Sequence, residues 1–332
     1  MSEDRRIGLT ATIPVEVVLA AGLKPVDLNN LFVAHPHSAR LLQLAEVQGL
    51  PRQVCAWIRG IYAAADDAGI QRLAAVVRGD CTNAEALAEL WRHRGKDVVR
   101  FAYPLQPDRA QVAEAIQELC RELQTDLPSA ERWRERLMPI RRDLATLDEL
   151  CWREGRVSGG ECFNWQVASS DFRSDPESFG RELASFIEQA AARKPRAPRI
   201  RLGISGVPPA ITDLCDVLET LGADVLFHES PRQFSMPYQV QNLAEQYARY
   251  TYPYPLPLRL RDVLEQVQLR GLHGVVHYVQ AFCFHGIEHA VLRERSPVPV
   301  LLLEGDEPGP TDERTRTRLQ AFIERISQER QL

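Results

Sequence analysis

The chain has 332 residues, 45% of them hydrophobic, and a formal net charge of −5 with an isoelectric point near 6.0. This length is enough for about two domains with ordinary cores. The negative charge gives no electrostatic basis for binding nucleic acid, and no apolar run reaches the roughly 18 residues of a membrane span. The first residues lack the apolar stretch of a secretory signal, so we expect a cytoplasmic protein without nucleic-acid or membrane partners.

The first half of the sequence predicts helices that alternate with strands. Pro14 and Gly22 are placed to begin and end a short helix. Thr82 and Glu85 match a capping box, which places Cys81 at a helix N-terminus, where the dipole and free N–H groups favour a thiolate. The other expected elements are a strand at 24–28, helices at 38–48 and 52–68, a strand–helix–strand unit at 73–77, 82–94 and 98–103, and helical segments over 107–157.

The same alternation restarts after a Pro-containing linker at 191–198. Strands that alternate with helices predict parallel sheets with right-handed crossovers. We therefore predict an α/β fold of two Rossmann-like, doubly wound lobes with helical insertions, residues 1–195 and 196–332. The elements expected in the second lobe are strands at 200–204, 224–228, 275–279 and 298–303, and helices at 211–221, 238–249, 258–270, 286–295 and from 311 onward.

Seven cysteines are spread along the chain without tight spacing, which favours a reduced protein over a disulfide framework. Cys81 and Cys283 each follow a strand-like run, and Cys55 precedes the first of these strands. Ligands bind at the carboxyl ends of strands in open α/β sheets, and three converging thiolates would suit an iron–sulfur cluster with one iron left open. Free cysteine is also a common buried hydrophobe. That interpretation applies to Cys120, Cys151 and Cys215, whereas Cys162 is a weak candidate ligand in a loop or helix start.

A resemblance to a known family runs through segments 13–26, 79–83, 99–104, 273–283, 299–306 and 317–324. These segments are similar to those of the 2-hydroxyacyl-CoA dehydratase and benzoyl-CoA reductase subunits, a family that includes the double-cubane-cluster proteins. The resemblance implies that Cys55, Cys81 and Cys283 bind a cluster in the crevice between the lobes. This cluster would be either [4Fe-4S] in each chain or a double cubane shared by two chains.

The resemblance also implies a function, namely that of a catalytic subunit in radical dehydration or reduction. The substrate would be a small molecule such as a CoA thioester. A separate ATP-dependent iron–sulfur activator would supply low-potential electrons, and the partner chain would be an identical copy or a paired family subunit. Two alternatives stay open: a homodimeric double-cubane-cluster reductase of a small substrate, and a non-catalytic electron-transfer or cluster-carrying protein.

A competing motif is formed by His285, Glu288 and His289, which match the H-x-x-E-H pattern of inverted zinc metallopeptidases. In such a site the two histidines bind zinc and the glutamate serves as the base. A zinc hydrolase is therefore a further alternative. The sequence does not otherwise single out a general acid or base: Glu304 or Asp306 at the end of a strand could carry a proton or cap the next helix.

Three further segments carry structural expectations. Residues 203–209 could form a phosphate-binding turn, although Pro208 and Pro209 lack amide donors and favour a tight turn that lines the crevice. The aromatic segment 250–257 is expected to form a wall of the second lobe, with substrate stacking or a dimer contact as the alternatives. The Arg-rich stretch 132–142 is interpreted as a solvated helix face.

Overall fold

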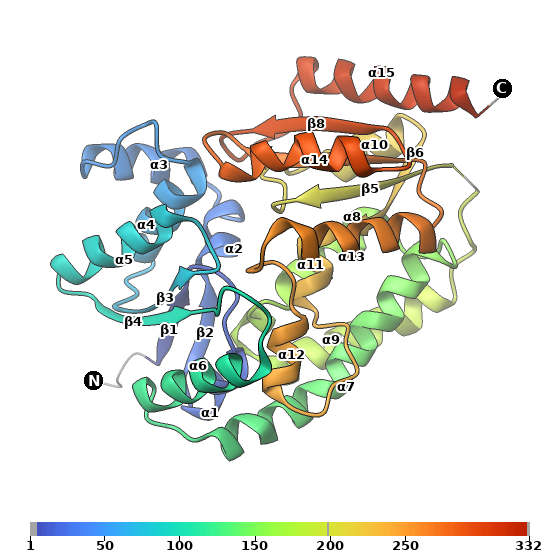
Figure 1. Ribbon diagram of the computed structural model, residues 1–332. Coiled ribbons are helices and arrows are strands. Elements are labelled where there is room, and N and C mark those ends of the chain that lie inside the picture. The colour runs from blue at the N-terminus through green and yellow to red at the C-terminus, as the bar shows by residue number, and fades with distance from the viewer. Residues whose placement is uncertain (1–4, 198, 331–332) are drawn as a thin grey trace.

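The computed structural model describes residues 5–197 and 199–330, and it has two lobes, each built on a four-stranded parallel sheet (Figure 1). The strand orders are β2-β1-β3-β4 and β6-β5-β7-β8, so both sheets have the same plan. The predicted α/β class with two Rossmann-like lobes is confirmed. The strands are β1 (Arg6–Leu9), β2 (Lys24–Asp27), β3 (Arg72–Arg78), β4 (Asp97–Ala102), β5 (Ile200–Gly206), β6 (Ala223–His228), β7 (Gly274–Gln280) and β8 (Val300–Gly305).

The strand order reverses direction in each sheet at its first strand. Strand β1 lies between β2 and β3, and β5 lies between β6 and β7. In the first sheet, the connection that follows β1 leads to β2 on one side and the connection that follows β3 leads to β4 on the other side. The connections that follow β5 and β7 diverge in the same way in the second sheet. A crevice opens at the carboxyl ends of strands whose connections diverge. Each lobe thus has one switch point at which a ligand can be held.

Helices cover both sheets and connect the two lobes. The long helix α7 runs from beneath the first sheet toward the second lobe (Figure 1), and its buried side places Leu144 and Leu147 in the core. In the first lobe and the connecting layer the helices are α1 (Val15–Ala20), α2 (Leu28–Val33), α3 (Ser38–Val47), α4 (Ala56–Asp67), α5 (Thr82–His93), α6 (Arg109–Glu122), α7 (Leu127–Trp152), α8 (Gly159–Ala168), η1 (Phe172–Ser174) and α9 (Pro176–Ala191).

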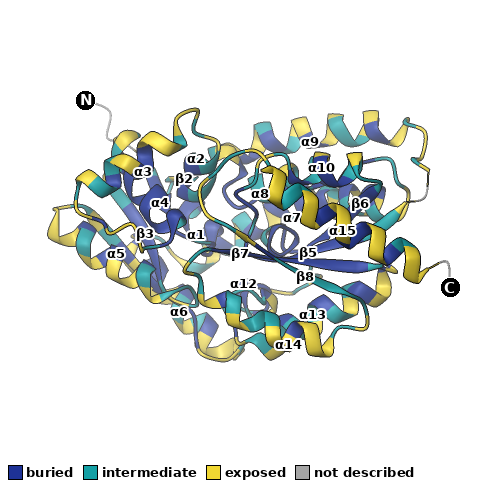
Figure 2. Ribbon diagram, turned by 90° about the horizontal axis from the view of Figure 1, so that it is seen from above, coloured by how far each residue is buried: buried dark blue, intermediate teal, exposed yellow. Residues whose placement is uncertain are grey.

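The later helices surround the second sheet, whose central strands are buried, while the outer faces of the helices are exposed (Figure 2). Strand β7 is buried along its whole length, as expected for a strand with helices on both faces. These helices are α10 (Leu214–Thr220), α11 (Glu229–Phe234), α12 (Leu243–Arg249), α13 (Leu256–Leu269), η2 (Phe284–Ile287), α14 (Glu288–Arg295) and α15 (Glu313–Glu329). Within the described residues, no helix combines the length and apolarity that a membrane crossing requires.

The aromatic segment 250–257 packs on the first lobe through Tyr250 and Tyr254, where the prediction of a wall for the second lobe was wrong, while Tyr252 lies against His285 of the second lobe with 5.9 Å between ring centroids. Tyr250 and Tyr254 belong to the same buried cluster as Phe101 and Tyr103 of the first sheet. The ring centroids of Tyr103 lie 6.0 Å from Tyr250 and 6.2 Å from Tyr254. The chain thus returns to the first lobe after β6. The domain boundary predicted near residue 195 stays a prediction. Residues on its C-terminal side, such as Tyr250 and Tyr254, pack in the core of the first lobe.

The Arg-rich stretch of α7 is also more than a solvated face. Arg134 and Arg141 are buried, while Arg142 is exposed as expected. Arg141 donates to the buried Glu16 of α1, with 2.5 Å between Nη2 and Oε1. Because a buried cation requires a partner, this pair fixes α7 against α1.

Candidate functional site

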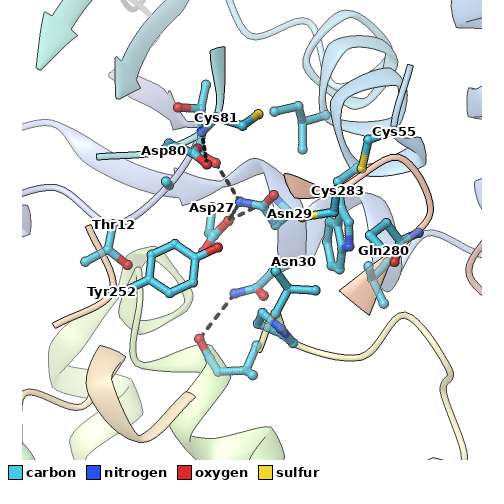
Figure 3. Close-up of a pocket in the computed structure, with 18 of the residues that line it drawn as sticks. Thr12, Asp27, Asn29, Asn30, Cys55, Asp80, Cys81, Tyr252, Gln280 and Cys283 are labelled. Carbon is cyan, nitrogen blue, oxygen red and sulfur yellow. Dashed lines mark hydrogen bonds between the residues drawn. The ribbon is translucent and has the colours of Figure 1, made fainter. Parts of the chain in front are cut away.

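The three predicted cysteines line a single cavity between the lobes, about 160 Å³ in volume (Figure 3). Cys55 and Cys81 come from the first lobe and Cys283 from the second. The sulfurs lie close enough that a charge on Cys283 raises the pKa of Cys55, and a charge on Cys55 raises that of Cys81. The structure therefore brings together side chains that are separated by up to 228 positions in the sequence.

Each of the three cysteines stands at the position immediately before a helix. Cys55 precedes α4, Cys81 precedes α5 and Cys283 precedes η2. The first N–H groups of a helix have no partner inside it and point toward such a position. The backbone N–H groups of Trp57 and Ile58 near Cys55, of Asn83 and Ala84 near Cys81, and of His285 near Cys283 favour the thiolate, although none of the three sulfurs forms a side-chain capping hydrogen bond.

The cavity lies at the switch points of both sheets. Residues 10–12 follow β1 and Cys81 follows β3, while residues 207–209 follow β5 and Cys283 follows β7, and all of them line the cavity. The expectation that the turn after β5 lines the crevice is confirmed. The geometry argues against a phosphate-binding turn, because the N–H of Gly206 already donates to Glu229 Oε2 at 2.7 Å and that of Val207 to the carbonyl oxygen of Tyr278 at 3.2 Å.

Burial keeps the three thiols protonated in the metal-free chain. It raises the pKa of Cys55 to about 11 and that of Cys81 to about 12, and it also raises the pKa of Cys283. The expectation of a lowered pKa for Cys81 was wrong, because desolvation exceeds the effect of the helix N–H groups. The capping box was also wrong: Thr82 lies inside α5, and the Glu85 side chain binds Arg100. A metal at these thiols must therefore displace protons.

The remaining cysteines lie away from this cavity. Cys120, Cys151 and Cys162 are buried, and Cys215 is half-buried against the second core. Cys162 contacts Asp148 on α7, with 3.9 Å between Sγ and Oδ1. These positions suit cysteines that act as small hydrophobic residues.

Several polar residues that the sequence interpretation missed also face the cavity. Asp27, Asn29 and Asn30 lie where β2 meets α2, and all three line the cavity (Figure 3). Asp27 accepts hydrogen bonds from the backbone N–H and the side-chain amide of Asn29, both at 2.9 Å, and from Ser170 Oγ at 2.6 Å. The run Asp-Leu-Asn-Asn after a strand was the available signal for this group.

Asp80 and Trp57 complete the wall beside the cysteines. Asp80 precedes Cys81 and accepts its backbone N–H at 2.8 Å, and burial raises the pKa of Asp80 to about 6. Trp57 lines the same cavity, and its indole N–H has no hydrogen-bond partner within the described chain. The indole nitrogen is itself buried, so this donor is unpaired inside the protein.

The H-x-x-E-H motif is already occupied by a cation of the protein. Arg259 Nη1 lies 2.8 Å from His285 Nδ1 and 2.8 Å from Glu288 Oε2. His289 does not join them; its ring stacks on His277, with 5.8 Å between centroids. Arg259 takes the place that a zinc ion would need, so the geometry argues against a hydrolase site here.

No group of three His, Cys, Asp or Glu side chains in the described parts of the chain is close enough to hold a single metal ion. A cluster has a different requirement, because its thiolates bind separate irons and surround a common space. The arrangement of Cys55, Cys81 and Cys283 around a cavity fits that requirement.

Comparison with known families gives a match over most of the chain. The model of the 2-hydroxyglutaryl-CoA dehydratase D-component family matches residues 10–326, which include both lobes and all three cavity cysteines. No curated protein matches the sequence. Because the family match spans nearly the whole chain, the protein belongs to the 2-hydroxyglutaryl-CoA dehydratase D-component family.

Proposed function

We propose that this chain is a catalytic subunit of a 2-hydroxyacyl-CoA dehydratase and that Cys55, Cys81 and Cys283 hold its iron–sulfur cluster. The observation that carries the proposal is that these three cysteines line one cavity at the switch points of both lobes. Each of them lies at the N-terminus of a helix. Thiolates are the soft ligands that iron–sulfur clusters require. Membership of a dehydratase family supports the reaction class.

The residues of the chain have separate tasks in this proposal. When bound, the cluster supplies single-electron chemistry and an iron that lacks a protein thiolate. The helix N–H groups offset the negative charge of the thiolates. Asp80, with its pKa raised to about 6, is placed to hold a proton beside Cys81.

The space around the cysteines favours an enzyme over a sealed electron carrier. A second cavity, about 610 Å³ in volume, adjoins the first. Both cavities are lined by Asn30, Val33, Phe163, Val167 and Pro209. A substrate can therefore extend from the thiols toward the outside, which a carrier protein would not need.

The proposal includes an electron donor and a partner chain. Electrons would come from an ATP-dependent iron–sulfur activator, and the partner would be a second copy or a paired family subunit. A homodimeric double-cubane reductase uses the same three cysteines, so it remains the alternative within the family.

The test is the metal content of protein purified without oxygen. We expect about four irons per chain, with a similar amount of acid-labile sulfide. Each of the substitutions Cys55→Ala, Cys81→Ala and Cys283→Ala should remove most of this iron, because a remaining pair of thiolates holds the cluster poorly. The matched controls Cys120→Ala and Cys215→Ala should retain it. Equal iron in all five variants, or zinc in place of iron, would refute the assignment.

A further inference from the structure

The charged side chains that line the cavity are acidic. Asp27 and Asp80 contribute carboxyl groups, whereas no arginine or lysine of the described residues contributes to this wall. Most of the remaining surface is aliphatic or aromatic, with Trp57, Ile61 and Phe163 among its members. The wall therefore offers apolar contact and, at Asp27, a carboxylate to whatever enters.

Two buried arginines that contact cavity residues, Arg59 at Cys55 and Arg259 at His285, are already neutralised. Arg59, one turn after Cys55 on α4, donates to Glu46 at 2.7 Å and to the carbonyl oxygen of Val54 at 2.9 Å. Arg259 contacts both Glu229 and Glu288 at 2.8 Å. These guanidinium groups cannot turn toward a ligand without leaving a carboxylate buried and unpaired.

Hydrogen bonds hold the carboxylate of Asp27 in place in the cavity wall. Ser170 and Asn29 together donate three hydrogen bonds to its oxygens, and its own backbone N–H donates to Asp171 Oδ2 at 2.8 Å. Asp27 is also buried. Its negative charge thus has a fixed position at the edge of the cavity.

From this wall we infer that the acyl group of the substrate carries no negative charge of its own. The inference rests on the proposed function, since it assigns an acyl thioester to the cavity. A second carboxylate on the acyl chain would lose its hydration and face Asp27, and the arginine that lines the second cavity, Arg173, is already paired with Glu182 at 2.8 Å. An aliphatic or aromatic acyl chain would instead bury apolar surface. The substrate class is therefore a neutral acyl thioester, although the family is described by a substrate with a second carboxylate.

The test compares two unreactive thioesters that differ at the end of the acyl chain. Pentanoyl-CoA and glutaryl-CoA both have five acyl carbons, and a methyl group in the first replaces a carboxylate in the second. Titration calorimetry with the iron-loaded protein should give a dissociation constant at least about tenfold lower for pentanoyl-CoA. A factor of ten corresponds to about 1.4 kcal/mol in binding free energy.

A substitution that adds a cation should reverse this preference. Val33 is half-buried and borders both cavities, so Val33→Lys places an ammonium group near the acyl chain. We expect its preference for pentanoyl-CoA to disappear or invert. The control Val33→Met, of similar length and without charge, should keep the preference of the original chain.

The possible outcomes separate the inference from the function on which it rests. Equal or tighter binding of glutaryl-CoA to the original chain would overturn the neutral-acyl inference and leave the dehydratase proposal in place. An unchanged preference in Val33→Lys would also count against it. If the iron-loaded protein binds neither thioester, both the inference and the proposal of an acyl-CoA substrate are overturned.

Discussion

At the scale of single residues, the ion pair between Glu16 and Arg141 is the clearest case of a charge that the fold requires. Burial tends to raise the pKa of Glu16, but Arg141 and hydrogen bonds from Tyr247 and Gln246 lower it overall. Glu16 is fully buried. A buried carboxylate that loses its cation is left uncompensated, which is far more costly than the loss of a surface pair.

We therefore expect Arg141→Met to lower the free energy of unfolding by about 3–5 kcal/mol. The matched control is the next residue: Arg142 is exposed on the same helix, so Arg142→Met should change stability by less than about 0.5 kcal/mol. Urea unfolding followed by circular dichroism measures both. Similar unfolding midpoints for the two variants would mean that the buried pair contributes little.

The sequence could not reveal this pair, because its two members are 125 positions apart. Arginines and glutamates at helical spacing are usually solvated, and local pattern cannot tell which one a distant helix will cover. The same limit applied to the cavity. Cys81 and Cys283 were predictable because each follows a strand, whereas the place of Asp27 in the wall depends on how both lobes meet.

At the scale of elements, two neighbouring glycines show how closely α8 approaches β6. A Cβ atom on Gly159 would lie 2.5 Å from the carbonyl oxygen of Val225, whereas one on Gly160 would come no closer than 3.4 Å to Cys215. Backbone cannot give way as a flexible side chain can. Gly159 is thus required for contact between the helix and the sheet, and Gly160 is not.

We expect Gly159→Ala to destabilise the protein by about 1–3 kcal/mol through overpacking. Gly160→Ala should be close to neutral, because an ordinary contact is formed there. Thermal unfolding of the two variants checks this, with a clearly lower midpoint for the first alone. Since α8 also carries Phe163 and Val167 of the cavity wall, the same shift should weaken thioester binding. Two variants of equal stability would contradict the proposed packing.

Most elements were predictable because their apolar runs and helix periodicity are local properties. The strand–helix–strand unit ending at β4 was predicted to within two residues of its bounds at each end. Strand β1 was missed, since four residues in Arg6–Leu9 are too few to show alternation. Helix α12 begins at Leu243 and not near 238, because Asn242 caps it through the N–H of Glu245.

At the scale of the whole molecule, the return of the chain to the first lobe couples the two sheets. Tyr247 on α12 donates to Glu16 Oε2 at 2.7 Å, and Tyr254 donates to the carbonyl oxygen of Tyr247 at 3.1 Å. Both tyrosines pack in the first core although they follow β6 in sequence. In the other direction, Arg270 of the second lobe binds Asp148 of α7 at 2.5 Å. The cavity between the lobes is held in shape by these crossings.

Because of this coupling, we expect Tyr254→Ala to weaken both sheets together. The side chain is buried, and removing a buried aromatic ring costs about 3–5 kcal/mol. Amide hydrogen exchange should show faster exchange in β3 of the first sheet and β7 of the second by similar factors, as in one cooperative unit. The control Val47→Ala, at a side chain that is 85% exposed, should leave both strands protected. Faster exchange confined to β3 would instead show that the two lobes unfold independently. The boundary predicted near residue 195 would then separate two folding units.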